Sequence, residues 1–135
     1  MSALGEAPVQ QFLAGKETVV LATVQADGAP LALAMWFLHE PASLTMISEA
    51  NTQKVRNLRR DPRVSVVAEA TGPIRGVAVE GRAEFLSDGP ERRALVERFH
   101  AKYPGLVTFW KGRAMPADRV MFRIVPARVR RWGLE

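Results

Sequence analysis

Short segments of the chain alternate hydrophobic residues with polar or small ones, and turn residues separate these segments. Alternation with a period of two, together with β-branched residues, predicts β-strands. The pattern predicts strands over residues 18–25, 31–38, 44–48, 64–70, 76–86, 120–125 and 128–132, the last two separated by a break at Pro126. Turns such as Ala26-Asp27-Gly28 and Gly72-Pro73 are short enough to join antiparallel neighbours.

Three segments have apolar residues at the helical spacing instead. We expect a short helix after Pro8 that ends at Gly15, a second helix over residues 53–60 and a third over residues 90–103. Thr52 is a suitable N-cap for the second helix. Asp61-Pro62 ends that helix, because the residue before a proline disfavours the helical region. Residues 105–116, which include Trp110, are expected to form a loop.

The order of these elements predicts the fold class. About seven strands with two or three inserted helices, joined mostly by short turns, favour a mainly β protein built on an antiparallel barrel. The regular alternation of strands and helices that builds a doubly wound sheet is missing. With 135 residues, the chain is expected to form one domain over residues 1–135.

The composition narrows the possible chemistry. The chain has no cysteine and two histidines, His39 and His100, so cysteine nucleophiles, disulfides and cysteine-type zinc sites are excluded. Both histidines are expected at the surface, and no metal site is predicted. No apolar run has transmembrane length, and the first residues lack the pattern of a signal peptide. We therefore expect a cytoplasmic protein with no membrane partner.

The charge balance suits an anionic partner. The net charge is +5 and the pI about 10.4, which suits nucleic acid, an acidic membrane or a phosphorylated small molecule. A solvated basic surface explains the same balance equally well. Four arginines, Arg56, Arg59, Arg60 and Arg63, gather at the second predicted helix. No helix-turn-helix pair, zinc finger or aromatic RNA-binding signature accompanies them. Solvated surface charges explain most of them better than nucleic-acid binding.

The clearest chemical signal runs from the strand end at Ser48 into the helix that begins at Gln53. The exposed N–H groups and the positive dipole end of a helix bind anions. Ser48 and Thr52 can donate hydroxyl hydrogen bonds, and Lys54 adds a positive charge in the first turn, where a lysine is unfavourable without an anion. These residues predict a phosphate site. A solvated basic helix with Thr52 as an ordinary cap explains the same spacing.

No other motif competes with this segment. The chain has no nucleophile elbow, dinucleotide-binding glycine motif or Walker loop. The three tryptophans, Trp36, Trp110 and Trp132, can fill the core or an interface. Each can also pack on a flat aromatic cofactor.

Taken in order, three blocks of sequence resemble the pyridoxamine 5'-phosphate oxidase-like superfamily. The longest is SEANTQKVRNLRRDPRV, over residues 48–64. The second is GVAVEGRAEFL, over residues 76–86. The third is Arg123-Ile124-Val125-Pro126, followed by Trp132-Gly133. The resemblance extends from about Thr18 to Gly133, and the order and spacing of the blocks carry it.

The resemblance implies a split β-barrel that forms a homodimer with two flavin sites at its interface. It places the flavin ring along the strand residues Leu33, Ala34, Met35 and Trp36 and the phosphate beside Ile47, Ser48, Thr52, Gln53 and Lys54. It also assigns Asn57 to cofactor binding and brings Trp132 to the flavin from the partner subunit. No catalytic acid or base is predicted.

Departures from the family pattern refine the expected activity. Leu33 and Gln53 stand where pyridoxamine phosphate oxidases have basic residues, and Gly76 stands where they have a flavin-contacting glutamine. The sequence ends at Glu135, before the arginine and histidine that hold pyridoxal phosphate in those enzymes. The resemblance therefore implies an oxidoreductase that uses FMN, or alternatively the deazaflavin coenzyme F420, to transfer hydride to a small-molecule substrate. A non-catalytic flavin- or haem-binding module or an electron carrier is the alternative.

Overall fold

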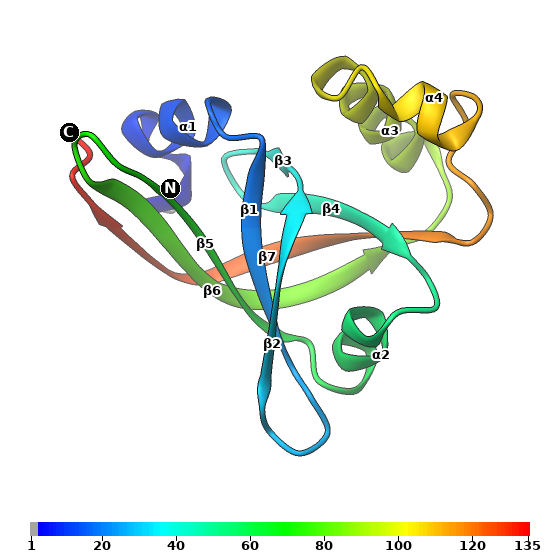
Figure 1. The fold of residues 1–135 in the computed structure, drawn as a ribbon, viewed down its shortest axis with the longest axis horizontal. Helices are drawn as coiled ribbons and strands as arrows, with labels where there is room; N and C mark the ends of the chain where they lie inside the picture. Colours follow the sequence, from blue (N-terminus) through cyan, green and yellow to red (C-terminus); the bar gives the residue numbers. More distant parts are fainter. Residues whose placement is uncertain (1–2) are drawn as a thin grey trace.

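The protein is described by a computed structural model over residues 3–135. Its centre is a seven-stranded antiparallel sheet that curls into a half-barrel (Figure 1). The order across the sheet is β2-β1-β5-β6-β7-β4-β3. The strands are β1 (Thr18–Val24), β2 (Pro30–Trp36), β3 (Leu38–His39), β4 (Leu44–Glu49), β5 (Arg63–Ala70), β6 (Arg75–Leu86) and β7 (Arg119–Trp132).

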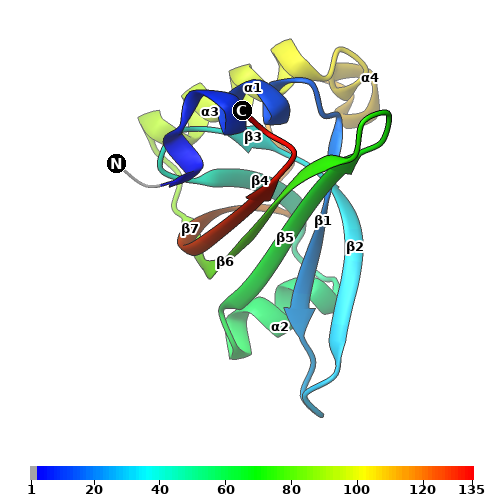
Figure 2. The same ribbon diagram turned by 90° about the vertical axis from the view of Figure 1, so that its left-hand side faces the viewer.

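The helices cover the two ends of this half-barrel. The described residues form α1 (Ala7–Ala14), α2 (Gln53–Arg60), α3 (Pro90–Lys102) and α4 (Leu106–Trp110), preceded by a 3₁₀ turn, η1 (Ala3–Gly5). Figure 2 shows α2 at one end, with α1, α3 and α4 at the other. None of these helices is long and apolar enough to cross a bilayer. The prediction of a mainly β, antiparallel split barrel is confirmed.

Proline explains where the strand prediction differs from the structure. The two strands expected around Pro126 are one strand, β7. In the pairing of β6 with β7, Glu80 lies opposite Arg128 and Gly81 opposite Pro126, so one residue of β7 has no partner. This bulge accommodates a residue that cannot donate to the ladder. Gly81 is required at the bulge, because a β-carbon there would overlap the carbonyl group of Val125.

The expected loop over residues 105–116 contains the short helix α4. A five-residue helix is too short to produce a helical repeat in the sequence. It ends at Lys111, which has a left-handed φ of 58°, and the N–H of Gly112 donates to the carbonyl of Val107 over 2.9 Å. The structure therefore adds a fourth α-helix to the two or three predicted.

Two hydrophobic clusters hold the elements together. The larger fills the half-barrel and includes Phe37, Met46, Phe122 and Ile124, all fully buried. The smaller lies beneath α3 and α4 and contains Leu38, Leu95, Val96, Phe99, Tyr103, Leu106 and Met121. Burial of these side chains fixes α3 and α4 over the end of the sheet where β4 stops and β7 begins.

Tyr103, just after α3, ties this helix to the strands. Its hydroxyl oxygen lies 2.7 Å from the carbonyl oxygen of Glu17 and accepts a hydrogen bond from the N–H of Phe37 over 2.9 Å. Its ring stacks on that of Trp36, with ring centroids 4.3 Å apart and planes inclined by 2°. Tyr103 thereby sets the orientation of the Trp36 ring at the end of β2.

Candidate functional site

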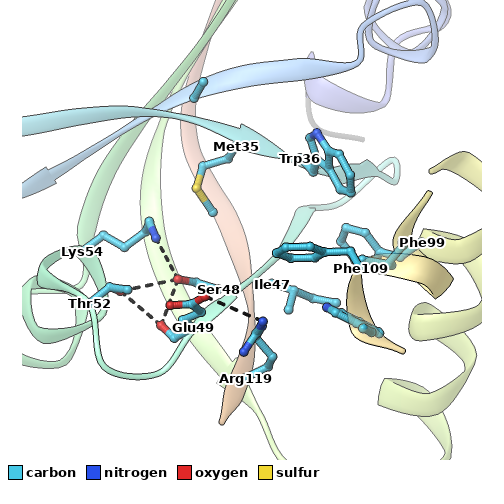
Figure 3. A pocket seen from close by; sticks show the side chains of 13 residues that line it. Met35, Trp36, Ile47, Ser48, Glu49, Thr52, Lys54, Phe99, Phe109 and Arg119 are labelled. Carbon is cyan, nitrogen blue, oxygen red and sulfur yellow. Dashed lines mark hydrogen bonds and ion pairs between the residues drawn. The ribbon is translucent and has the colours of Figure 1, made fainter. Parts of the chain in front are cut away.

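A cavity of about 340 Å³ opens where β2, the end of β4, the first turn of α2 and the α3–α4 pair meet (Figure 3). One end is polar and the other aromatic. Its lining residues are Ala34, Met35, Trp36, Ile47, Ser48, Glu49, Thr52, Lys54, Phe99, Leu106, Phe109, Trp110 and Arg119. The cavity therefore brings together most of the candidate cofactor-binding residues, from two separate strands and one helix.

The polar end is built from the strand end and helix start that the sequence singled out. Figure 3 shows Ser48, Thr52 and Lys54 pointing toward one another. Lys54 Nζ donates a hydrogen bond to Ser48 Oγ over 2.8 Å, and Ser48 Oγ lies 3.4 Å from Thr52 Oγ1. An ammonium group and two hydroxyls, converging at a helix N-terminus, form a donor set suited to a phosphate group.

Thr52 occupies the N-cap position of α2 without capping it through its side chain. Its hydroxyl instead donates to the carbonyl oxygen of Glu49 over 3.1 Å. The side chain of Thr52 therefore leaves the N–H groups of the first turn of α2 without a cap. These donors remain available for an external acceptor.

Lys54 is half-buried, and its ammonium group has therefore lost part of its hydration. Burial is the main cause that lowers the pKa of Lys54, and the carboxylate of Glu49 opposes that shift. Desolvation disfavours the ammonium form, whereas a bound anion would favour it. The negative charge of a phosphate group beside Lys54 would thus stabilise the ammonium group that burial has partly desolvated.

Arg119 is a lining residue that the sequence analysis missed. It begins β7 and lies opposite Glu49 of β4 in the sheet. Its side chain is only 13% exposed, and its guanidinium group forms ion pairs with Asp118 at 2.6 Å and with Glu49 at 3.7 Å. No local motif marks this arginine, because only the pairing of β4 with β7 brings it to the cavity.

The aromatic end consists of Trp36 from β2, Phe99 from α3, and Leu106, Phe109 and Trp110 from α4. Trp110 makes an edge-to-face contact with the ring of His100, at a centroid distance of 5.4 Å. Phe109 is 68% exposed although it is a large apolar residue. The α4 helix thus presents two aromatic rings to the cavity, of which Trp110 also packs against His100 and Phe109 is exposed.

The surface position expected for His100 is wrong. Its side chain is 6% exposed, and Nε2 lies 2.8 Å from the carbonyl oxygen of Arg113, which can only accept a hydrogen bond. The buried Nδ1 has no partner within the described residues. His39 is half-buried, with Nδ1 2.7 Å from Gln10 Oε1. Neither histidine lines the cavity.

Four candidate residues lie outside the cavity lining. Leu33 is exposed on β2. Gln53 Nε2 donates to Asn57 Oδ1 over 2.8 Å, and the buried Asn57 in turn donates to Thr23 Oγ1 over 3.0 Å. Trp132 lies opposite Gly76 near the end of β7. A β-carbon at Gly76 would overlap its indole ring, so the glycine makes room for the tryptophan.

Lys102, at the end of α3, contacts Phe37 and Tyr103 and has a lowered pKa. Its Nζ donates to the carbonyl oxygen of Phe37 over 2.8 Å and lies 3.7 Å from the centroid of the Phe37 ring. Both contacts favour the ammonium form. Burial outweighs them and, with the charge of Arg98, lowers the pKa of Lys102 to about 8.

This pKa predicts a measurable dependence of stability on pH. Since the folded-state pKa lies below the ordinary value of 10.5, the unfolded chain binds more protons between about pH 8 and 10.5. Lys102 therefore makes the free energy of unfolding rise with pH in that window. We expect Lys102→Met to lose this contribution. Urea unfolding at several pH values would then show that the free energy of unfolding rises less steeply with pH in the variant than in the wild type. Equal slopes for the variant and the wild type would contradict the assignment.

Comparisons with known proteins agree with this architecture. A sequence profile of the family described as pyridoxamine 5'-phosphate oxidase matches residues 6–133. A conserved hypothetical protein from Mycobacterium tuberculosis is 32% identical, with 98% of this chain and 84% of that chain covered and a TM-score of 0.79.

Two other solved structures share the fold at lower identity. An FAD-binding protein from Mesorhizobium loti is 24% identical, with 96% of this chain and 90% of that chain covered and a TM-score of 0.75. A haem storage protein from Vibrio cholerae is 18% identical, with 96% and 95% covered and a TM-score of 0.80. Because the family profile spans almost the whole chain, this protein belongs to the pyridoxamine 5'-phosphate oxidase family.

Proposed function

We propose that the cavity binds a flavin-type cofactor, FMN, and that the protein is a flavin- or deazaflavin-dependent oxidoreductase acting on a small molecule. The observation that carries this proposal is the convergence of Lys54, Ser48 and the uncapped start of α2 at one end of a partly aromatic cavity. This donor set fits a phosphate, and the wall formed by β2 and Ile47 fits a flat ring. An FAD-binding protein among the fold relatives supports a flavin.

Different residues of the cavity would bind the phosphate and the ring of the cofactor. Lys54, Ser48 and the first-turn N–H groups of α2 would hold the phosphate. Ile47 and the β2 residues Ala34, Met35 and Trp36 would lie along the ring. When bound, a flavin supplies hydride transfer, and the protein supplies binding, orientation and electrostatics. Glu49, Lys54 and Arg119 are the titratable side chains that line the cavity, and the proposal assigns none of them as acid or base.

Coenzyme F420 is the alternative cofactor, since it offers a related ring and a phosphate. Three arginines of α2, Arg56, Arg59 and Arg60, are the candidates for its acidic tail. The guanidinium carbon of Arg59 lies 4.1 Å from the centroid of the Phe85 ring, and Arg60 donates to the carbonyl oxygen of Val24. Arg56 donates to Asn51 and Gln53 at the helix start. Binding of the acidic tail would need to displace some of these contacts, which favours FMN.

We also propose that the protein acts as a homodimer in the cytoplasm. Val20 and Val67 pair across β1 and β5 and are both exposed, as is Leu33 on β2. An apolar sheet surface of this kind is typical of an interface. A partner subunit would also supply the Trp132 that this chain places away from its own cavity.

Titration of the purified protein with FMN, followed by absorbance and flavin fluorescence, tests the proposal. We expect saturable binding with one FMN per subunit and a dimer in sedimentation velocity. Reduction of an electron acceptor by the loaded protein would then separate an enzyme from a non-catalytic flavin module or electron carrier. Binding of haemin without binding of FMN or coenzyme F420 would overturn the proposal in favour of a haem module.

A further inference from the structure

The aromatic end of the cavity has no uncompensated positive charge. Its walls are the side chains of Trp36, Phe99, Leu106, Phe109 and Trp110. The lining cation beside these walls, Arg119, has its guanidinium carbon 6.0 Å from the centroid of the Phe109 ring. Asp118 and Glu49 already form ion pairs with that guanidinium group. An anionic ligand at this end would have to break an existing ion pair or remain unpaired, and both cost free energy.

The other cation of the cavity lies at its polar end. Lys54 donates to Ser48 beside the start of α2, where the proposed function places the cofactor phosphate. Figure 3 shows Lys54 and Phe109 at opposite ends of the cavity. Once a phosphate neutralises Lys54, the cavity has no free positive charge for a second anion. A further ligand at the aromatic end is therefore expected to carry no negative charge.

Phe109 is held in place although its ring is exposed. Leu106, one turn earlier in α4, is buried, and Trp110 packs against the buried His100. The left-handed conformation of Lys111 and the hydrogen bond from Gly112 to Val107 end the helix immediately afterwards. An exposed aromatic ring on a fixed element loses little conformational entropy on binding and prefers a flat apolar partner.

We infer that the aromatic end of the cavity binds a flat aromatic substrate without a negative charge and that Phe109 is a specificity-determining residue that contacts it. This inference rests on the proposed function, because the cofactor must occupy the polar end. The substrate would be recognised by ring stacking and apolar burial, so its class is planar and not anionic.

Binding of two matched probes to the FMN-loaded protein tests this inference. The probes are 2-naphthol, which is neutral at pH 7, and 2-naphthalenesulfonate, which has the same ring system with a negative charge. We expect equilibrium dialysis to show 2-naphthol binding about 10-fold more tightly than the sulfonate, and Phe109→Ala to weaken 2-naphthol binding about 10-fold. FMN affinity should stay within about twofold of the wild type in this variant.

A matched control is Ile74→Ala. Ile74 is 65% exposed, as Phe109 is 68% exposed, but it lies outside the cavity lining. The Ile74→Ala substitution should leave the affinities for 2-naphthol and FMN unchanged.

Three results would overturn the inference. Tighter binding of the sulfonate would indicate an anionic substrate. A large loss of FMN affinity in Phe109→Ala would place the ring of Phe109 against the cofactor, and dissociation of a dimer in that variant would place it in a subunit interface.

Failure of the proposed function gives a different result from failure of this inference. If the wild-type protein binds no FMN, the proposed cofactor is wrong. The same two probes and the Phe109→Ala variant, measured without FMN, then still show whether the aromatic end selects a neutral flat molecule. Equal affinities of both probes for the wild type and the variant would overturn the inference alone.

Discussion

Lys54→Ala is expected to weaken FMN binding about 10- to 100-fold, because a hydrogen bond to a charged group contributes about 1.5–3 kcal/mol. Lys54 is the one ammonium group among the residues that line the cavity, and its Nζ lies 2.8 Å from Ser48 Oγ. The substitution also removes a partly buried ammonium group, whose charged form a bound anion would stabilise. Fluorescence titration with FMN measures the change.

Riboflavin provides the internal control, since it has the same ring without the phosphate. We expect Lys54→Ala to bind riboflavin as the wild type does. The matched variant Lys16→Ala also removes a lysine, one whose Nζ donates to the carbonyl oxygen of Glu69 outside the cavity. It should leave FMN affinity unchanged. Equal FMN affinity of Lys54→Ala and the wild type would remove the basis for the proposed phosphate site.

Asn57→Ala is expected to lower the free energy of unfolding by about 1–3 kcal/mol, because the buried hydroxyl of Thr23 would lose its hydrogen-bond partner. Asn57 is fully buried. It donates to Thr23 Oγ1 over 3.0 Å and accepts from Gln53 Nε2 over 2.8 Å. These bonds fasten α2 to β1 beneath the polar end of the cavity. Urea unfolding at neutral pH measures the loss.

Asn51→Ala is the matched control for this variant. Asn51 is exposed, and its side chain accepts a hydrogen bond from the exposed Arg56, over 3.0 Å. Its substitution should change stability by no more than about 0.5 kcal/mol. If Asn57→Ala were as stable as the wild type but lost FMN affinity, Asn57 would be a cofactor ligand and not a scaffold residue.

The polar end of the cavity could be predicted from sequence because it lies within one continuous segment. Ser48, Thr52 and Lys54 are at most six positions apart. A strand end followed by a helix start places such residues together through local geometry alone. The bounds of α2 were also predictable, since Asp61-Pro62 ends the helix through a local steric effect. The same locality explains why the strand alternation predicted the antiparallel sheet.

Only the tertiary structure decided the other half of the cavity. Arg119 reaches it through the pairing of β7 with β4, and Phe109 through the packing of α3 and α4 on the second hydrophobic cluster. A helix as short as α4 has no stability of its own, so its position depends on burial of neighbours such as Leu106. Sequence spacing cannot encode contacts made across more than fifty residues. The sequence by itself therefore determined the strands and the convergence of Ser48, Thr52 and Lys54, whereas long-range packing determined the aromatic wall at the other end of the cavity.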